Sequence, residues 1–225
     1  MKIDRHKMYA VLTGDIVGFS RLAEKERIRL HQLMRQGSDV LRQAFGRAVP
    51  LDLDIFRGDS WQLLVTHPAL SLRVGISYRA YMRVRMQSNQ IDTRMAIAIG
   101  RIDYLPEDGI SGADGEAFRR SGEALEAMPK DRRLTLARCQ DDGKPIARAV
   151  DVVVQLVDHL AMRWTQKQAQ AIAGALQGWT QEKIARGWWE SRITQQAVAQ
   201  HLDRAGWSAV ARALEFIEDL YRDSA

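Results

Sequence analysis

The chain has 225 residues, of which 46% are hydrophobic and 27% charged, and its formal net charge is +5. With 16 glycines and 5 prolines, this composition is ordinary for a globular protein and excludes a collagen-like or low-complexity chain. The single cysteine, Cys139, excludes an internal disulfide framework and a multi-cysteine zinc site. No stretch approaches the roughly 18 apolar residues of a membrane-spanning helix. We therefore expect a cytoplasmic protein without a membrane partner.

The first half alternates predicted strands and helices. A buried strand is expected over 8–14, directly before Asp15, and a helix over about 22–45. Strands at 51–56 and 61–65 flank the turn Arg-Gly-Asp-Ser, which predicts a hairpin. A helix follows over about 69–88, and then a buried strand over 93–100. The second helix is expected to be basic on its outer face, at Arg73, Arg79, Arg83 and Arg85.

This order, β-α-β-β-α-β, is that of the split βαβ or ferredoxin-like arrangement. A glycine-rich loop at 106–115, a helix at about 116–128 and a short strand at 134–138 complete the first half. The turn at 141–145 is the best candidate for a domain boundary. We predict an α+β protein with a ferredoxin-like sheet domain at 1–145 and an all-helical domain at 146–225.

The spacing of apolar residues predicts helices throughout the second half. Apolar residues recur at helical spacing over 147–162. Three later segments each begin with threonine and glutamine, and Thr165, Thr180 and Thr194 are plausible N-caps. Residues 150–225 hold eight Lys and Arg against nine Asp and Glu, a net charge of −1. The excess positive charge therefore lies in the sheet half.

Two carboxylates are expected to meet at one end of the sheet. Asp15 ends the first strand, and Asp59 lies in the hairpin between the second and third strands. In this strand order the first and third strands are neighbours, so the two residues converge. Paired carboxylates beside a basic surface suit Mg²⁺, which fills its remaining positions with water and phosphate oxygens. Alternatively, both residues serve only their turns.

The peptide Thr-Gly-Asp-Ile-Val-Gly-Phe-Ser at 13–20 resembles the first-aspartate motif of class III nucleotidyl cyclases, the adenylate and guanylate cyclases. Arg-Gly-Asp at 57–59 resembles their second-aspartate hairpin, and the interval of 44 residues between Asp15 and Asp59 is the one that the family uses. Residues 95–100 resemble the next buried strand of these enzymes.

The resemblance implies a metal set of Asp15, Ile16 and Asp59 that holds Mg²⁺ or Mn²⁺. It also implies a nucleotide or phosphate-bearing ligand and a homodimer, because cyclases build their sites at a dimer interface. Over nearly the whole length, and including Asp-Gly-Glu-Ala-Phe at 114–118, the sequence also resembles the SatD family of small bacterial proteins.

The sequence departs from the cyclase pattern on the catalytic helix. Alignment on Gly115 places Arg119 at the family's asparagine position and Glu123 at its arginine position. Arg119 or Arg120 could stabilise phosphate charge after a small shift in register. The base-reading positions are occupied by Ile55 and Gly112, which cannot make the expected contacts. This departure favours nucleotide or phosphate binding over standard cyclic nucleotide synthesis.

Three glycines are candidates for binding phosphate through their backbone amides. The loop at 109–115 precedes a helix, where backbone amides can hold an anion. Gly112 and Gly115 are the candidates in this loop, and Gly58 is the candidate in the hairpin. A flexible turn is the alternative for the loop.

The C-terminal region fits a helix-turn-helix pattern over 194–214. In that arrangement Trp207, Ser208 and Arg212 begin the recognition helix and face the major groove. The net charge of −1 argues against DNA, because phosphate neutralisation supplies most non-specific affinity. A helical hairpin used for dimerisation or internal packing is the alternative.

These patterns favour a regulatory protein that binds a nucleotide or phosphate ligand through a metal and transmits this to its helical part. Three alternatives remain open: an enzyme that makes a cyclic nucleotide at a non-standard site, a DNA-binding transcriptional regulator, and a structural protein whose aspartates are relics.

Overall fold

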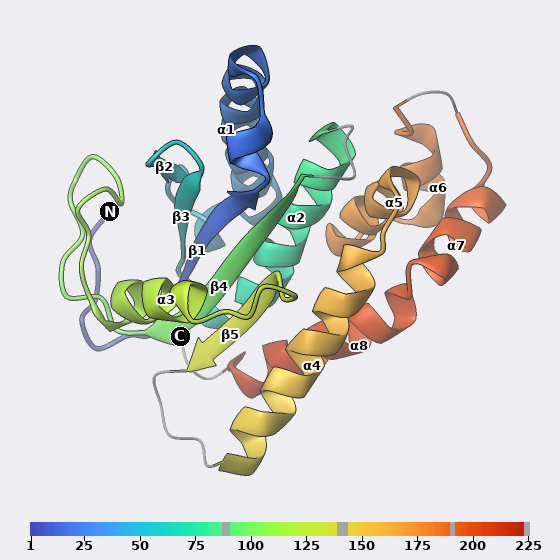
Figure 1. Ribbon diagram of the computed structural model, residues 1–225. Coiled ribbons are helices and arrows are strands. Elements are labelled where there is room, and N and C mark those ends of the chain that lie inside the picture. Colours follow the sequence, from blue (N-terminus) through green and yellow to red (C-terminus); the bar gives the residue numbers. More distant parts are fainter. Residues whose placement is uncertain (87–90, 139–143, 190–191, 223–225) are drawn as a thin grey trace.

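The computed structural model describes residues 1–86, 91–138, 144–189 and 192–222. The protein is mixed α and β, with one five-stranded sheet and helices on both of its faces (Figure 1). The strands are β1 (Tyr9–Val17), β2 (Asp54–Phe56), β3 (Ser60–Val65), β4 (Asp92–Gly100) and β5 (Leu134–Arg138). The α-helices are α1 (Glu24–Phe45), α2 (Ser71–Met86), α3 (Glu116–Glu126), α4 (Lys144–Met162), α5 (Gln166–Leu176), α6 (Gln181–Arg186), α7 (Gln195–Arg204) and α8 (Trp207–Leu220). Three short 3₁₀ turns are η1 (Phe19–Arg21), η2 (Gly46–Ala48) and η3 (Pro68–Leu70).

The sheet has the order β2-β3-β1-β4-β5, with β1 at its centre. β1 pairs antiparallel with both β3 and β4, and β2 pairs with β3 in the expected hairpin. β5 adds to β4 in parallel. The register places Asp15 opposite Ser60 on β3 and opposite Arg94 on β4. The end of β1 therefore adjoins the β2–β3 turn.

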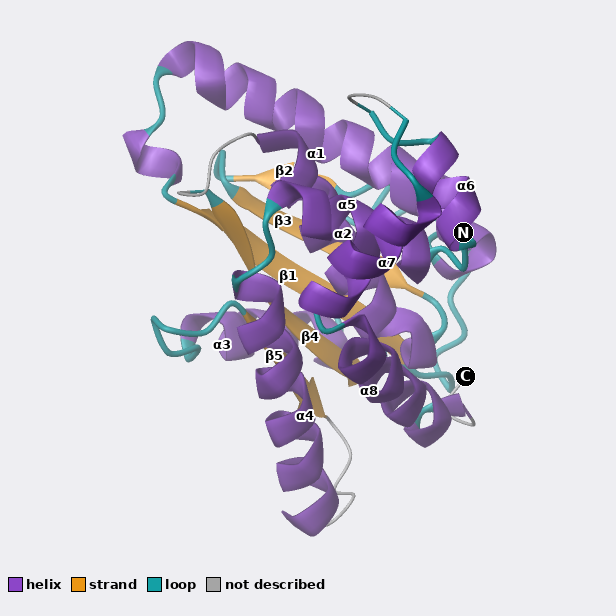
Figure 2. Ribbon diagram, turned by 90° about the vertical axis from the view of Figure 1, so that its right-hand side faces the viewer, coloured by secondary structure: helices purple, strands orange, loops and turns teal. Residues whose placement is uncertain are grey.

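The two faces of the sheet carry different helices (Figure 2). α2 packs on one face and contacts α1, whereas α3 packs on the other face against β1, β4 and β5. Trp61 lies on the α2 side, where its ring meets that of Tyr78 edge-on at 4.7 Å between centroids. Gly14 makes this possible, because a Cβ at that position would lie 2.4 Å from the Trp61 ring.

The helical half packs against the sheet half. α5 and α8 contact α2, and α4 contacts β5. One hydrophobic cluster includes residues from both halves, from Ala10 on β1 to Tyr221 after α8. Among the described residues no helix is long and apolar enough to span a membrane. Cys139 and most of the predicted boundary at 141–145 lie outside the described residues, and the division at 145 stays a prediction.

The three predicted threonine caps are confirmed. The side chain of Thr165 accepts the N–H of Gln168, that of Thr180 accepts Lys183, and Thr194 accepts Ala197. Each bond satisfies an amide that has no partner within the first turn of the helix. These caps fix where α5, α6 and α7 begin.

The expected basic outer face of α2 is wrong, because most of its arginines make internal ion pairs. Arg79 is 1% exposed and binds Asp92 at 2.6 Å and Asp158 on α4 at 2.6 Å. Arg83 binds Asp92 at 2.8 Å, and Arg73 binds Glu218 on α8 at 2.6 Å. The helical periodicity predicted that this basic face of α2 is exposed to solvent. In the structure, α4, α5 and α8 pack against it.

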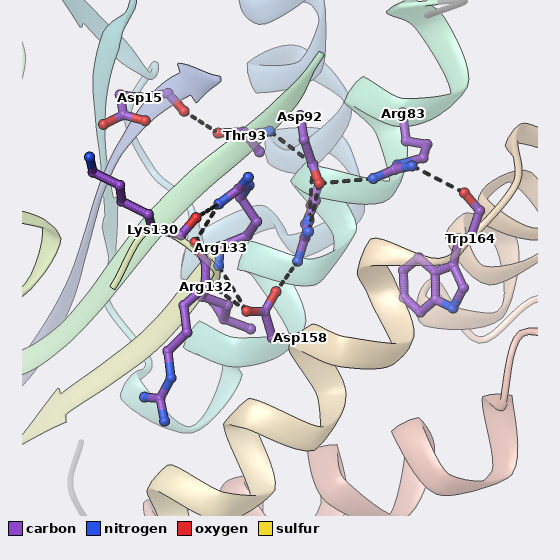
Figure 3. Close-up of polar contacts among 11 residues, drawn as sticks. Asp15, Arg83, Asp92, Thr93, Lys130, Arg132, Arg133, Asp158 and Trp164 are labelled. Atoms are coloured by element: carbon purple, nitrogen blue, oxygen red, sulfur yellow. Dashed lines mark hydrogen bonds and ion pairs between the residues drawn. The ribbon is translucent and has the colours of Figure 1, made fainter. Parts of the chain in front are cut away.

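Arg79, Arg83, Asp92 and Asp158 form a buried ion network, shown in Figure 3. Asp158 also accepts the backbone N–H groups of Arg133 and Leu134, at 2.8 and 3.2 Å. The network therefore joins α2, β4, α4 and the start of β5. Burial alone would raise the pKa of Asp92. Arg79 and Arg83 together lower it by more than burial raises it, so this pKa lies below its usual value.

Removal of Arg79 should destabilise the whole protein. In Arg79→Met both Asp92 and Asp158 lose a partner while still buried, which costs about 3–5 kcal/mol of unfolding free energy. Urea unfolding followed by circular dichroism measures this loss. The control Arg42→Met breaks the exposed pair with Asp52 and should cost less than about 1 kcal/mol. Equal losses in the two variants would contradict the role of the network.

Acid should weaken the network through Asp92. Since its folded pKa lies below the unfolded value, the unfolded chain binds the proton more readily. The stabilisation is complete above the unfolded pKa of about 4 and is lost as pH falls through the folded pKa. Urea midpoints between neutral pH and the acid range should fall less steeply in Asp92→Asn than in the wild type. Parallel curves would refute this assignment.

Candidate functional site

The backbones of the two predicted aspartates lie side by side at one end of the sheet. The N–H of Ile16, the residue after Asp15, donates to the backbone carbonyl of Asp59 at 3.2 Å. β1 therefore lies beside the hairpin as predicted, but the strand continues to Val17 and Asp15 does not end it. Ile16 has a buried, apolar side chain, so only its backbone could contribute a ligand.

Arg94 holds the carboxylate of Asp15. Its Nη2 lies 2.6 Å from Oδ2, and its Nε lies 3.2 Å from both carboxylate oxygens. The two side chains are 23% and 25% exposed, so water still reaches the pair. A charge-assisted, forked contact of this kind orients the carboxylate. Any cation that binds Asp15 must share or displace this arginine.

Arg94 is not among the site residues predicted from the sequence. The sequence does contain an indication of its role. Arg94 is the one charged residue in the strand predicted over 93–100, Thr-Arg-Met-Ala-Ile-Ala-Ile-Gly, whose other residues are typical of a buried strand. Such a residue needs a partner, because an unpaired charge is costly at a half-buried position. The antiparallel register makes Asp15 that partner.

The hairpin turn is tied to α1. Arg57 and Gly58 both have positive φ, at 51° and 82°, a conformation that suits glycine better than other residues. His31 on α1 donates from Nε2 to the carbonyl of Gly58, and its ring stacks on Phe19. The carboxylate of Asp59 accepts the hydroxyl of Ser60 at 3.4 Å and is partly exposed. These contacts fix the turn that carries Asp59.

Asp15 projects from the α3 face of the sheet. Thr13, two residues earlier on the same strand, bonds Ser121 of α3 at 2.7 Å between hydroxyls. Because side chains alternate along a strand, Asp15 shares the face of Thr13. A cavity of about 220 Å³ lies nearby, lined on its charged rim by Arg21, Glu26 and Arg29. Neither aspartate lines this cavity.

The structure places Gly115 and Arg119 toward the other end of the sheet. Gly115 lies beside Ile102, just after β4, where its Cβ would be 2.6 Å from the Ile102 Cα. The opposite end of β4 holds Arg94 and Asp15, about 20 Å away at ~3.3 Å per strand residue. Gly112 and the start of α3 share this far end.

Arg119 forms ion pairs with two carboxylates of the segment between β4 and α3. It binds Asp114 at 2.6 Å and Asp103 at 3.2 Å, on the exposed surface. Arg120 lies 3.6 Å from Glu116, one helical turn earlier. The carboxylate of Asp114 also accepts the N–H of Gly115 at 2.7 Å. Within one chain, therefore, Arg119 is held away from Asp15 and Asp59, whereas Arg120 adjoins Ser121, which bonds Thr13 two residues before Asp15.

A metal would rely on a small donor set. Among residues 1–86, 91–138, 144–189 and 192–222, no three His, Cys, Asp or Glu side chains form a group that could hold an ion. Asp15 and Asp59 supply two carboxylates, which is enough for Mg²⁺ when water and phosphate complete its shell. The chemistry of the donor set thus fits a metal that arrives with a phosphorylated ligand.

The residues predicted for DNA lie where α8 begins. Gly206, with φ 73°, makes the turn from α7. Trp207 is partly buried, whereas Ser208 and Arg212 are exposed and line an open depression with Gln181 and Asp203.

No family model and no curated protein matches the chain. Solved structures of nucleotidyl cyclases are similar to 58% of it, each with a TM-score of 0.44. The guanylyl cyclase Cya2 is 13% identical over 75% of its own length, and the adenylyl cyclase CyaB from P. aeruginosa is 18% identical over 76%. A bacterial light-regulated adenylyl cyclase is 15% identical over 75%. At this level of similarity we take neither activity nor ligand from these enzymes.

Proposed function

We propose that this protein binds a nucleotide or similar phosphorylated ligand at the Asp15 end of its sheet, together with a divalent cation. The observation that carries the proposal is that the backbones of Asp15 and Asp59 lie side by side, since the N–H of Ile16 bonds the Asp59 carbonyl. The strand order and the two aspartate motifs support a ferredoxin-like, cyclase-type sheet as the frame of this site.

Arg94 gives the site a cation of its own. A polyphosphate carries several negative charges, so it can pair with Arg94 while Asp15 turns to a metal. The exchange is feasible because the Asp15–Arg94 pair is partly exposed, and such pairs contribute only about 0–1 kcal/mol. Metal and phosphate should therefore bind together more readily than either one alone.

Binding without turnover is favoured over catalysis. Arg119 bonds Asp103 and Asp114 at the far end of the sheet, so within a single chain it is held away from the phosphates. The alternative is an enzyme in which a second copy supplies these residues across a dimer interface. Turnover by the monomer would then be absent, and turnover by the dimer would depend on Arg119 or Arg120.

The ion network supports a regulatory role. Asp92 accepts the N–H of Thr93 at 2.9 Å, and the Thr93 hydroxyl donates to the Asp15 carbonyl at 3.1 Å. A continuous set of bonds thus runs from Asp158 on α4 through Arg79 to the candidate site (Figure 3). Ligand binding at Asp15 can bias the helical half through this set.

Loss of either aspartate should abolish nucleotide binding. Calorimetric titration of the four ribonucleoside triphosphates with Mn²⁺ should show binding that needs the metal. Asp15→Asn and Asp59→Asn should each weaken it by at least about tenfold, since even an outer-shell partner of a metal is worth that much. Asp52→Asn, an exposed carboxylate nearby, is the matched control.

Mass spectrometry of the same samples separates binding from catalysis. Unchanged triphosphate supports the proposal, whereas a new product that disappears in Asp59→Asn would establish an enzyme. Equal affinity in the wild type and both site variants would exclude the aspartates as the ligand site.

Replacement of Arg94 should change the affinities for metal and for phosphate in opposite directions. In Arg94→Gln, Asp15 loses its competing cation, so Mn²⁺ alone should bind roughly fivefold tighter, the equivalent of about 1 kcal/mol. Tripolyphosphate should bind more weakly, because its arginine partner is gone. Manganese electron paramagnetic resonance measures the first change and calorimetry the second. Mn²⁺ affinity that stays constant would contradict the competition.

A further inference from the structure

We propose that α7 is a DNA-reading helix, whose exposed face enters the major groove of a duplex. This inference is independent of the phosphate site, and it moves the reading surface away from the start of α8. It follows from the two faces of α7, from the way its neighbours hold it, and from the local charge.

The exposed face of α7 is polar. Val198 and Leu202 are buried, whereas Gln195, Gln196 and Gln200 are exposed. Each glutamine amide offers a donor and an acceptor, the pair that recognises the major-groove edge of adenine. A helix that presents several amides and no large apolar side chain on this face suits base edges better than a protein core.

Neighbouring elements hold α7 rigidly. It packs on α5 and α6, and its first turn is closed by the Thr194 side chain bonded to the Ala197 N–H at 3.1 Å. The ring of His201 stacks on Trp188, which follows α6, with centroids 5.5 Å apart. Gln195 donates to Gln181 of α6 at 3.4 Å. Short helices braced in this way can present one face without local unfolding.

α8 is bound to the body of the protein instead. Val210, Leu214 and Ile217 are buried, and Glu218 pairs with Arg73 of α2 at 2.6 Å. α8 also contacts α4 and η3. It therefore anchors α7 to the sheet half, and Ser208 and Arg212 at its start flank the reading face.

The charge of the helical half is divided, although its total is −1. Residues 180–212 hold five Lys and Arg against three Asp and Glu, a net charge of +2. Residues 213–225 hold one arginine against four acids, a net charge of −3. The pKa of His201 on α7 is lowered by burial and then by the cations Lys167 and Arg204. Lys167 and Arg204 thus lie close to α7, where they can pair with the phosphates of a duplex.

The test begins with selection of a duplex. The full-length protein is incubated with a random-sequence duplex library, and the enriched duplex is labelled for fluorescence anisotropy. We expect at least tenfold tighter binding to this duplex than to a scrambled one, with affinity that falls between about 50 and about 200 mM salt. Failure to enrich any sequence, or tighter binding to single strands or RNA, would overturn the proposal.

Variants then locate the reading face. Gln195→Ala and Gln200→Ala should each reduce the preference for the enriched duplex by about tenfold, one good base contact, and leave the scrambled duplex unaffected. Arg204→Ala should weaken both duplexes alike. Gln155→Ala, at an exposed position on α4, is the matched control and should change nothing. All of these side chains are exposed, and circular dichroism confirms that the variants fold. Loss of preference in Ser208→Ala alone would assign the reading face to α8 and overturn the proposal.

Discussion

The buried guanidinium of Arg79 determines how the two halves of this protein fit together. It pairs with Asp92 on β4 and with Asp158 on α4, and Asp158 in turn accepts two amides at the start of β5. A buried charge that loses its partner costs several kcal/mol. Separation of α4 from the sheet would break the Arg79–Asp158 ion pair and the two amide bonds to Asp158, so the helical half is held in one position.

The candidate site depends on the same constraint. Asp92 precedes Thr93, whose hydroxyl bonds the Asp15 carbonyl, and Trp61 donates to that hydroxyl at 3.0 Å from within the core. The next residue, Arg94, holds the Asp15 carboxylate. Three consecutive residues of β4 thus connect the ion network, the core and the site. Asp15 and α4 are thus joined by a continuous set of hydrogen bonds and ion pairs.

The helical half divides its tasks between neighbouring helices. α8 carries acidic residues and binds the sheet half, whereas α7 has an exposed polar face beside the cations Lys167 and Arg204. α5 contacts both α2 and α7, so it lies between the ion network and the proposed reading face. The proposed phosphate site and the proposed reading face are therefore connected through packed helices, which a segregated pair of domains would lack.

The sequence by itself determined the local elements and one long-range contact. Periodicity and turn residues placed β1, the β2–β3 hairpin, α3, β5 and the threonine caps, and the strand order brought Asp15 to the Asp59 turn. Periodicity could not show that Arg79 is buried, because a basic helix face looks the same whether water or carboxylates cover it.

Only the tertiary structure decided the pairing of Arg94 with Asp15, the distance of Arg119 from both aspartates and the different surroundings of α7 and α8. Each of these depends on register and packing between segments that lie far apart in the chain, and no local pattern records that information.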